Sequence, residues 1–345
     1  MITNKQKFSM MFYLSRAFFL GIGTSLVLSS GKRDAWFGAI LGLLIGLLMV
    51  LCVSYIQKRK QNVSIYNIFK EMKFIGWLIK LLMIIFAIFI IVQALVILQT
   101  YTSSFFLLKT PPWIIELAVL SAALYIVSKG LNSTFRMAEI FLPLSILIFV
   151  FCAFNLFPHV KLDNFLPIFT TKTTSILKSA LFFSTFSAAP ILLMVQLNDN
   201  GKYLIPSYLI SSITIVLVIS VCLGVFGVHL ANIFRYPEYV ALKKISIFNF
   251  IEKVENILSI NWVIDLIGII VLATHFLKDV MPSKKGKCVF TLIITAIFIF
   301  SSFAFGTYYS LDTSMYYYSS YVLLGLFIVI VGPLIFYLKL KKDKN

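Results

Sequence analysis

The sequence is poor in the residues on which enzymatic and metal-dependent sites are usually built. It contains 3 His and 4 Cys, all far apart. Neither set has the spacing of a metal site, and no phosphate-binding glycine-rich loop or nucleophile–base arrangement is present. These absences argue against an enzyme, an ATP-driven protein and a metal site, and we expect no cofactor.

Charged residues are also scarce, at 12%, whereas 60% of the chain is hydrophobic and the mean hydropathy is +0.97. A soluble domain cannot carry that apolar load, so the composition predicts an all-α membrane protein with several spans. The first apolar run is long, and no small-residue cleavage site follows it. We therefore interpret it as a retained signal-anchor helix.

Ten stretches of mostly apolar residues approach the ~20 residues that a span needs. They form a single polytopic domain over residues 1–345 and lie at about 8–30, 35–56, 75–100, 112–128, 137–158, 178–197, 204–230, 256–277, 288–306 and 318–338. The fourth is the shortest and holds Glu116.

The net charge of +17 comes mainly from Lys and Arg in short loops between these spans. That distribution is the positive-inside pattern of a protein in a lipid bilayer, and it disfavours a nucleic-acid partner. Most of the 30 Lys and Arg residues, Arg16 among them, fall on the side that carries both termini. The pattern predicts that both termini are cytoplasmic.

Glycine, serine and proline interrupt two of the apolar stretches. Gly21-Ile22-Gly23-Thr24 lies in the first, and Ser184-Thr185-Phe186-Ser187, followed by Pro190, lies in the sixth. Broken backbone is tolerated in lipid only where protein or water surrounds it. Paired interruptions in two halves point to a transporter's midplane site. The chain then divides into inverted repeats of five spans each, about 8–158 and 178–338.

The first interruption is a candidate substrate-binding segment. Gly21 and Gly23 have no side chain, so amides near Ile22 can face a ligand, and a half-helix N-terminus suits a carboxylate. Thr24 adds a hydroxyl donor. The alternative is that the glycines only permit close helix packing.

The second candidate segment contains three hydroxyls, on Ser184, Thr185 and Ser187, around Phe186. These hydroxyls are suited to binding a ligand at midmembrane depth. The alternative is that they donate to carbonyls of their own helix.

Ionisable and polar side chains inside spans are costly and usually functional. Asp265 is the deepest acid, and it can carry a proton, bind a cation or pair with a base; we assign it to proton or ion coupling. Gln93 faces either a central cavity or a neighbouring helix, and we include it among the candidate substrate-binding residues. Glu116 and His275 lie near span ends, where solvation is the simpler explanation.

Two loops are long enough to contain structure. Residues 57–74 carry Ile65, Ile68 and Phe69 on one helical face, which predicts an amphipathic segment. Residues 231–256 are expected outside the membrane, either as a helix pair capping a cavity or as a solvated loop.

Several further stretches occur in a characteristic order. The sequence has Asp34-Ala35-Trp36, then Gly130-Leu131-Asn132, then Tyr236-Pro237-Glu238-Tyr239, and finally Phe250-Ile251-Glu252-Lys253-Val254-Glu255 before Trp262. With the glycine break, this order resembles the spore germination permease family, the B subunits of nutrient germinant receptors. That family belongs to the amino acid–polyamine–organocation transporter superfamily.

The resemblance implies a LeuT-like 5+5 fold with discontinuous helices 1 and 6. It also implies a nutrient-sensing subunit, with an amino acid as the favoured ligand, in the inner spore membrane or cell membrane of an endospore-forming bacterium. Its partners would be a larger membrane subunit and a lipoprotein. One departure concerns span 6, where Ser187-Ala188-Ala189 replaces the Gly-x-Glu frequent in relatives, which puts the usual ligand class in doubt.

Two alternatives to a sensor remain from the sequence. The chain can be a proton-coupled amino acid transporter that uses Asp265, or a water or ion pore lined by hydroxyl groups. Fold and topology do not separate these functions, because function depends on the site.

Overall fold

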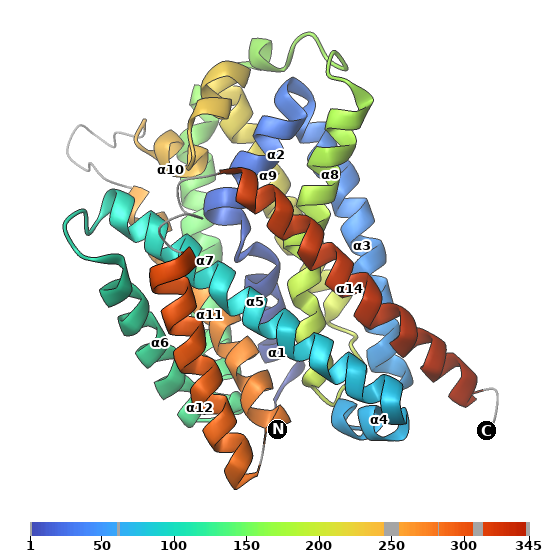
Figure 1. Cartoon of the computed structure of the whole chain (residues 1–345). Coiled ribbons are helices and arrows are strands. Elements are labelled where there is room, and N and C mark those ends of the chain that lie inside the picture. Colours follow the sequence, from blue (N-terminus) through green and yellow to red (C-terminus); the bar gives the residue numbers. More distant parts are fainter. Residues whose placement is uncertain (1, 61–62, 245–254, 282, 306–312, 343–345) are drawn as a thin grey trace.

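The computed structural model describes residues 2–60, 63–244, 255–281, 283–305 and 313–342. Over these ranges the chain forms helices and no β-strand. Figure 1 shows long helices packed side by side, with the N-terminal and C-terminal ends on the same side of the bundle as α4. The prediction of an all-α protein is confirmed.

The helical elements follow one another with few long connections. They are α1 Asn4–Arg16, η1 Phe19–Gly23, α2 Thr24–Gly31, η2 Lys32–Asp34, α3 Ala35–Arg59, α4 Ile65–Glu71, α5 Lys73–Phe105, α6 Pro112–Ser128, α7 Leu131–Leu156, η3 Phe157–His159, η4 Leu162–Phe165, α8 Thr173–Ala188, η5 Ala189–Gln196, α9 Leu204–Ile233, α10 Pro237–Leu242, α11 Glu255–Val280, α12 Lys284–Ile299, η6 Phe300–Phe305 and α14 Thr313–Lys342.

Eight helical stretches in the described part of the chain are long and apolar enough to cross a membrane. The short fourth span of the sequence prediction is α6, an apolar helix of 17 residues. The first predicted span is divided into α1, the π-helical segment η1 and α2. The multi-span architecture and the break in the first span are therefore both confirmed.

The sixth span is also discontinuous, but its break follows the hydroxyl run. α8 stays α-helical through Ser187 and ends at Ala188, and the 3₁₀ segment η5 begins at Ala189. Pro190 has no N–H to continue the α-helical hydrogen bonds, so the helix changes type where Pro190 enters. The hydroxyl residues themselves lie on regular helix.

Two glycines allow α3 to approach its neighbours closely. A Cβ atom at Gly42 would lie 2.5 Å from Cβ of Phe183 on α8, and one at Gly46 would collide with the Tyr208 hydroxyl on α9. Small residues are the usual way for membrane helices to pack at short distance. This packing holds α8 against α3.

The two long loops differ in how much of them can be described. In the first, Ser64 caps α4, and Ile65, Ile68 and Phe69 are buried, so the amphipathic segment is confirmed. In the second, α10 is described, whereas residues 245–254, with Ile247, Phe250, Ile251 and Val254, lie outside the described residues.

Candidate functional site

The break in the first span is a π-helical turn rather than an unwound loop. The Gly23 N–H donates to the Phe18 carbonyl at 3.0 Å, and the N–H and hydroxyl of Thr24 both donate to the Phe19 carbonyl, the hydroxyl at 2.8 Å. A Cβ atom at Gly23 would lie 2.7 Å from the Phe18 carbonyl oxygen, so the turn requires glycine there. In this state the amides of Gly23 and Thr24 bond within the turn.

A cavity of about 50 Å³ lies beside this turn. One cation, Arg16, and one acid, Glu238 of α10, line it together with Thr24, and the remaining lining is mostly apolar. That remainder comes from η1, α7, α9 and α10: Phe19, Phe149, Cys152, Ala153, Leu156, Thr214, Ile215, Leu217, Val218, Val221, Cys222 and Leu242. Since one water needs roughly 10–15 Å³, the cavity has room for a few waters and must widen to hold a larger solute.

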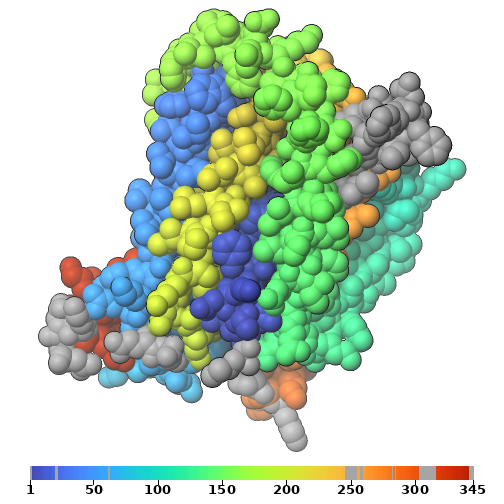
Figure 2. Space-filling view, turned by 180° about the vertical axis from the view of Figure 1, so that it is seen from behind, coloured from blue at the N-terminus to red at the C-terminus, as the bar shows by residue number. Residues whose placement is uncertain are grey.

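The cavity lies where α1 meets two of its neighbouring helices. In Figure 2, α1 in dark blue lies between α9 in yellow and α7 in green. α1 contacts both helices, and the cavity lining comes from the same two helices at the end of α1. Movement of α1 relative to α7 and α9 would therefore change the size of the cavity.

Arg16 at the end of α1 is paired with Asp265 of α11. Nη2 of Arg16 lies 3.5 Å from Oδ2 of Asp265, and the two side chains are 3% and 0% exposed. The guanidinium also lies 4.8 Å from the ring centre of Phe12. Nη1 of Arg16 and both carboxylate oxygens of Asp265 lack a hydrogen-bond partner within the described residues.

This pairing corrects one part of the sequence analysis. The positive-inside count treated Arg16 as a residue at the cytoplasmic edge, but its side chain is 2% exposed inside the bundle. An arginine within the first apolar run was the available signal, and the partner could not be identified because Asp265 lies in a distant span. A buried ion pair with few hydrogen bonds is costly, which favours a functional role.

A hydrogen-bonded chain continues from the same region. Tyr13 of α1 bonds the Ser145 hydroxyl of α7 at 2.9 Å, and Ser145 in turn donates to the side chain of Asn261 on α11. The indole of Trp262 donates to the Ala17 carbonyl, which follows α1, at 3.2 Å. These contacts fix the end of α1 between α7 and α11, so they hold Arg16 in position.

The hydroxyl residues of the sixth span lie apart from the cavity. Ser184 donates to the Leu181 carbonyl at 3.0 Å, and Ser187 donates to Phe183 at 2.8 Å and contacts the Tyr208 hydroxyl at 3.1 Å. These contacts match the alternative in which the hydroxyls bond their own helix. Thr185 is buried with them.

Aromatic rings fill the space between the two interrupted spans. The ring centre of Phe186 lies 6.1 Å from that of Phe18 and 6.5 Å from that of Phe19, and Phe183 lies 4.8 Å from Phe19. Ile22 is 3% exposed in the same core. Of the substrate-binding residues predicted from sequence, the structure places Thr24 in the cavity lining.

Gln93 lies away from the cavity, between α5 and α14. Its amide nitrogen donates to the Ser319 hydroxyl at 3.3 Å, and its amide oxygen is buried without a hydrogen-bond partner in the described part of the chain. The contact agrees with the second alternative for this residue, a bond to a neighbouring helix.

Two ionisable residues expected to be solvated are buried. Glu116 is 0% exposed and accepts hydrogen bonds from Ser301 and Ser302, and His275 is 3% exposed with Thr134 at 3.3 Å. Solvation at a span end was therefore the wrong explanation for both. Helices packed around α6 and α11 remove the water that their sequence positions suggested.

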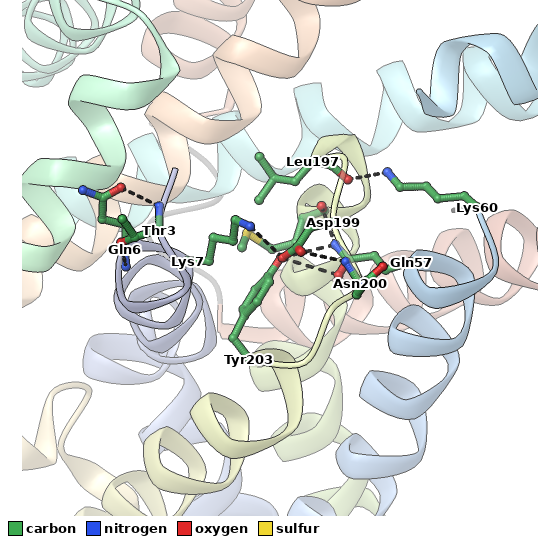
Figure 3. A network of polar contacts seen from close by, with 10 residues as sticks. Thr3, Gln6, Lys7, Gln57, Lys60, Leu197, Asp199, Asn200 and Tyr203 are labelled. Atoms are coloured by element: carbon green, nitrogen blue, oxygen red, sulfur yellow. Dashed lines mark hydrogen bonds and ion pairs between the residues drawn. The ribbon is translucent and has the colours of Figure 1, made fainter. Parts of the chain in front are cut away.

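A second polar network surrounds the C-terminal end of η5. The Lys60 ammonium donates to the carbonyls of Val195 and Leu197, and the Gln57 amide donates to Met194 at 2.7 Å. Lys7 of α1 pairs with Asp199 at 2.8 Å, and Figure 3 shows these side chains converging on the segment after η5. Burial lowers the pKa of Lys60 to about 8, although the nearby Asp199 opposes the shift.

Within the described residues, no group of three His, Cys, Asp or Glu side chains is placed to hold a metal ion. A guanidinium and a carboxylate line a small, mostly apolar cavity beside the π-helical turn of the first span.

Comparison with solved structures supports the architecture. The chain aligns with a mutant of the manganese transporter of Eremococcus coleocola at a TM-score of 0.58, with 11% identity, over 96% of this chain and 76% of that one. At that identity the likeness concerns the fold alone, which is a transporter fold of the LeuT-like type.

Comparison with sequences identifies the family. The Bacillus anthracis spore germination protein XB is 23% identical over 336 residues, covering 93% of each chain. The Bacillus subtilis (strain 168) spore germination protein YfkT is 24% identical over 274 residues, covering 77% of this chain and 76% of that protein. The family model for spore germination proteins (spore permeases) matches residues 2–307. The chain therefore belongs to the spore germination protein family.

Proposed function

We propose that this chain is the nutrient-binding and sensing subunit of a spore germinant receptor, and that it binds a small nutrient, an amino acid being the favoured class. Its family and its transporter-like fold support this assignment. Sensing requires only that the ligand bind one of two conformations more tightly than the other. Net transport is not required.

The cavity beside the broken first span is the observation that carries the proposal. It combines one guanidinium, one carboxylate and an apolar lining. These groups complement a zwitterion with an apolar side chain, because Arg16 suits a carboxylate and Glu238 suits an ammonium group. The small volume favours a state that opens before the ligand enters.

The proposed binding residues lie at or near the two helix interruptions, except Gln93, which lies on α5. We retain the set predicted from sequence and add the charged cavity lining: Gly21, Ile22, Gly23, Thr24, Gln93, Ser184, Thr185, Phe186 and Ser187, with Arg16 and Glu238. The hydroxyls of the sixth span donate to their own helix in the described state, so a ligand would meet them only after α8 changes its position relative to η1.

The proposed setting follows the family resemblance. The chain would lie in the inner spore membrane or the cell membrane with both termini in the cytoplasm, and it would act with a larger membrane subunit and a lipoprotein. We further propose that residues of about 8–158 and 178–338 form the two inverted repeats. Binding would shift the equilibrium between two states of the complex, which is the coupling that starts germination.

The test is ligand-dependent thermal stability of the purified chain across the twenty amino acids and common sugars. A ligand at 100 times its dissociation constant should stabilise the folded state by about 2.7 kcal/mol. Val218→Phe should abolish the shift, because Val218 lines the cavity, and Val216→Phe on the same helix should keep it. A shift that survives Val218→Phe would contradict binding in this cavity, and a flat panel would contradict binding by the isolated chain.

A proton-coupled amino acid transporter is the second candidate. The burial of Asp265 at 0% exposure favours it, because buried acids in spans often carry protons. It predicts saturable uptake into vesicles that falls in Asp265→Asn. Absence of uptake for a ligand that binds would leave sensing as the function.

A further inference from the structure

Glu116 and two serines form a buried polar cluster away from the cavity. Glu116 lies in the second turn of α6 and is fully buried. Its Oε2 accepts a hydrogen bond from Ser301 at 2.9 Å and another from Ser302. Its Oε1 has no hydrogen-bond partner in the described part of the chain.

No cation neutralises this carboxyl group in the described structure. The described ion pairs involve other residues. α6 packs against α5, α7, α11, α12 and η6. Charged or titratable side chains on these elements are Lys73, Lys80 and Tyr101 on α5, Arg136, Glu139 and Cys152 on α7, Glu255, Asp265, His275, Lys278 and Asp279 on α11, and Lys285, Lys287 and Cys288 on α12.

The described hydrogen bond between a cation and α6 lies at the other end of that helix. Lys278 donates to the Val127 carbonyl at 3.4 Å, which is about 16 Å along the helix from Glu116 at 1.5 Å per residue. Tyr101 is bonded to Ser259, and Asp265 is paired with Arg16. Glu116 is therefore held by hydroxyl groups and not by an opposite charge.

An isolated ionised carboxylate in a membrane interior is costly enough that such a group neutralises instead. Serine hydroxyls both donate and accept hydrogen bonds, so the pair can satisfy the neutral acid as well as the carboxylate. Both serines lie in the π-helical segment η6. Such π segments frequently mark functional sites.

We propose that Glu116, Ser301 and Ser302 form a proton-binding site that joins α6 to η6 and is separate from the nutrient cavity. Glu116 holds the proton as a carboxylic acid while α6 and η6 are packed together. When these elements separate, the O–H bond breaks, the proton passes to water and the carboxylate becomes hydrated. Protonation of Glu116 is thereby coupled to the packing of η6, in the ninth predicted span, against α6.

The test is infrared spectroscopy of the purified full-length chain in lipid at neutral pH. The C=O stretching band of a protonated carboxylic acid should be present, should shift slowly in D₂O, and should lose intensity in Glu116→Gln. Ser301→Ala with Ser302→Ala should move the band without removing it. Glu71→Gln, at an exposed acid, is the matched control and should leave the band unchanged.

Two spectroscopic results, and one result on stability, would overturn the proposal. One is a wild-type band that is absent or that Glu116→Gln leaves intact. The other is a band that disappears when sodium or potassium chloride is added at constant pH, since that result identifies a metal-cation site. Because Gln is a neutral isostere, Glu116→Gln should keep the wild-type thermal midpoint within a few degrees. A large loss of stability would indicate that the ionised form is the native one.

Discussion

Asp265 and Glu116 are both fully buried acids in membrane spans, yet their partners differ in kind. Asp265 faces the guanidinium of Arg16 at 3.5 Å and has no hydrogen-bond partner within the described residues. Glu116 has two hydroxyl donors and no ion pair in the described structure. Arg16 neutralises Asp265, and the pair links α11 to α1. On our proposal, a bound proton neutralises Glu116 instead.

The two acids differ in how many charges are exposed when their contacts break. Breaking the Arg16–Asp265 pair exposes two charges at once, which suits a contact that changes only when the whole site rearranges. Releasing a proton from Glu116 exposes one charge beside groups that can satisfy it. On the sensor proposal, the first pair would take part in the ligand-dependent rearrangement and the second site would exchange a proton.

The largest expected effect is the loss of one partner of the buried pair. Arg16→Gln should destabilise the chain by about 3–5 kcal/mol, because it leaves Asp265 buried without its cation. Chemical or thermal unfolding in detergent measures this loss. The double variant Arg16→Met with Asp265→Leu should recover much of it, since no charge then remains. Equal stability of Arg16→Gln and wild type would contradict the pairing.

A smaller effect concerns Lys60, a buried cation outside the spans. Its pKa is about 8 in the folded chain, compared with about 10.4 in an unfolded chain. Between these values the unfolded state binds more protons, so stability should rise with pH by up to about 3 kcal/mol. Below pH 8 both states are protonated and the contribution is constant.

Unfolding measured from pH 7 to pH 10.5 tests this dependence. Lys60→Met should flatten the rise, whereas Lys58→Met, at an exposed neighbour, should keep it. The same slope in wild type and Lys60→Met would show that another group causes the pH dependence. Together with the Arg16 variants, these measurements compare the stability contribution of Lys60, which is held by carbonyls, with that of Arg16, which is held by a carboxylate.

The smallest effect belongs to the exposed pair of Glu71 and Lys341. Their N···O distance is 2.6 Å, and the side chains are 40% and 44% exposed. The hydrogen bond from Lys341 lowers the pKa of Glu71, so the contribution is present above the normal carboxyl pKa and is lost in acid. Solvent screening limits it to about 0–1 kcal/mol. A double-mutant cycle of Glu71→Gln and Lys341→Met measures it, and a coupling as large as that at Arg16 would remove the distinction between buried and exposed pairs.

The predictability of the site differed between its parts. Gly21 and Gly23 marked the broken first span, because a turn that has no room for a side chain requires glycine, which is visible in the sequence. The sixth break lay just after the hydroxyl run, because Ser184 and Ser187 satisfy their hydroxyls on their own helix. Sequence patterns could not distinguish the two outcomes, since a hydroxyl serves equally well for back-bonding and for binding.

The sequence by itself determined that this is a multi-span helical membrane protein, where most of its spans lie and which family it belongs to, because apolar length, breakers and motif order are local properties. Tertiary structure alone decided that Arg16 meets Asp265, that Glu116 is buried beside Ser301 and Ser302, and that Glu238 reaches the cavity. These contacts join segments that are distant in the sequence. Their energies depend on which faces pack together and which water is removed, and neither is encoded in any one segment.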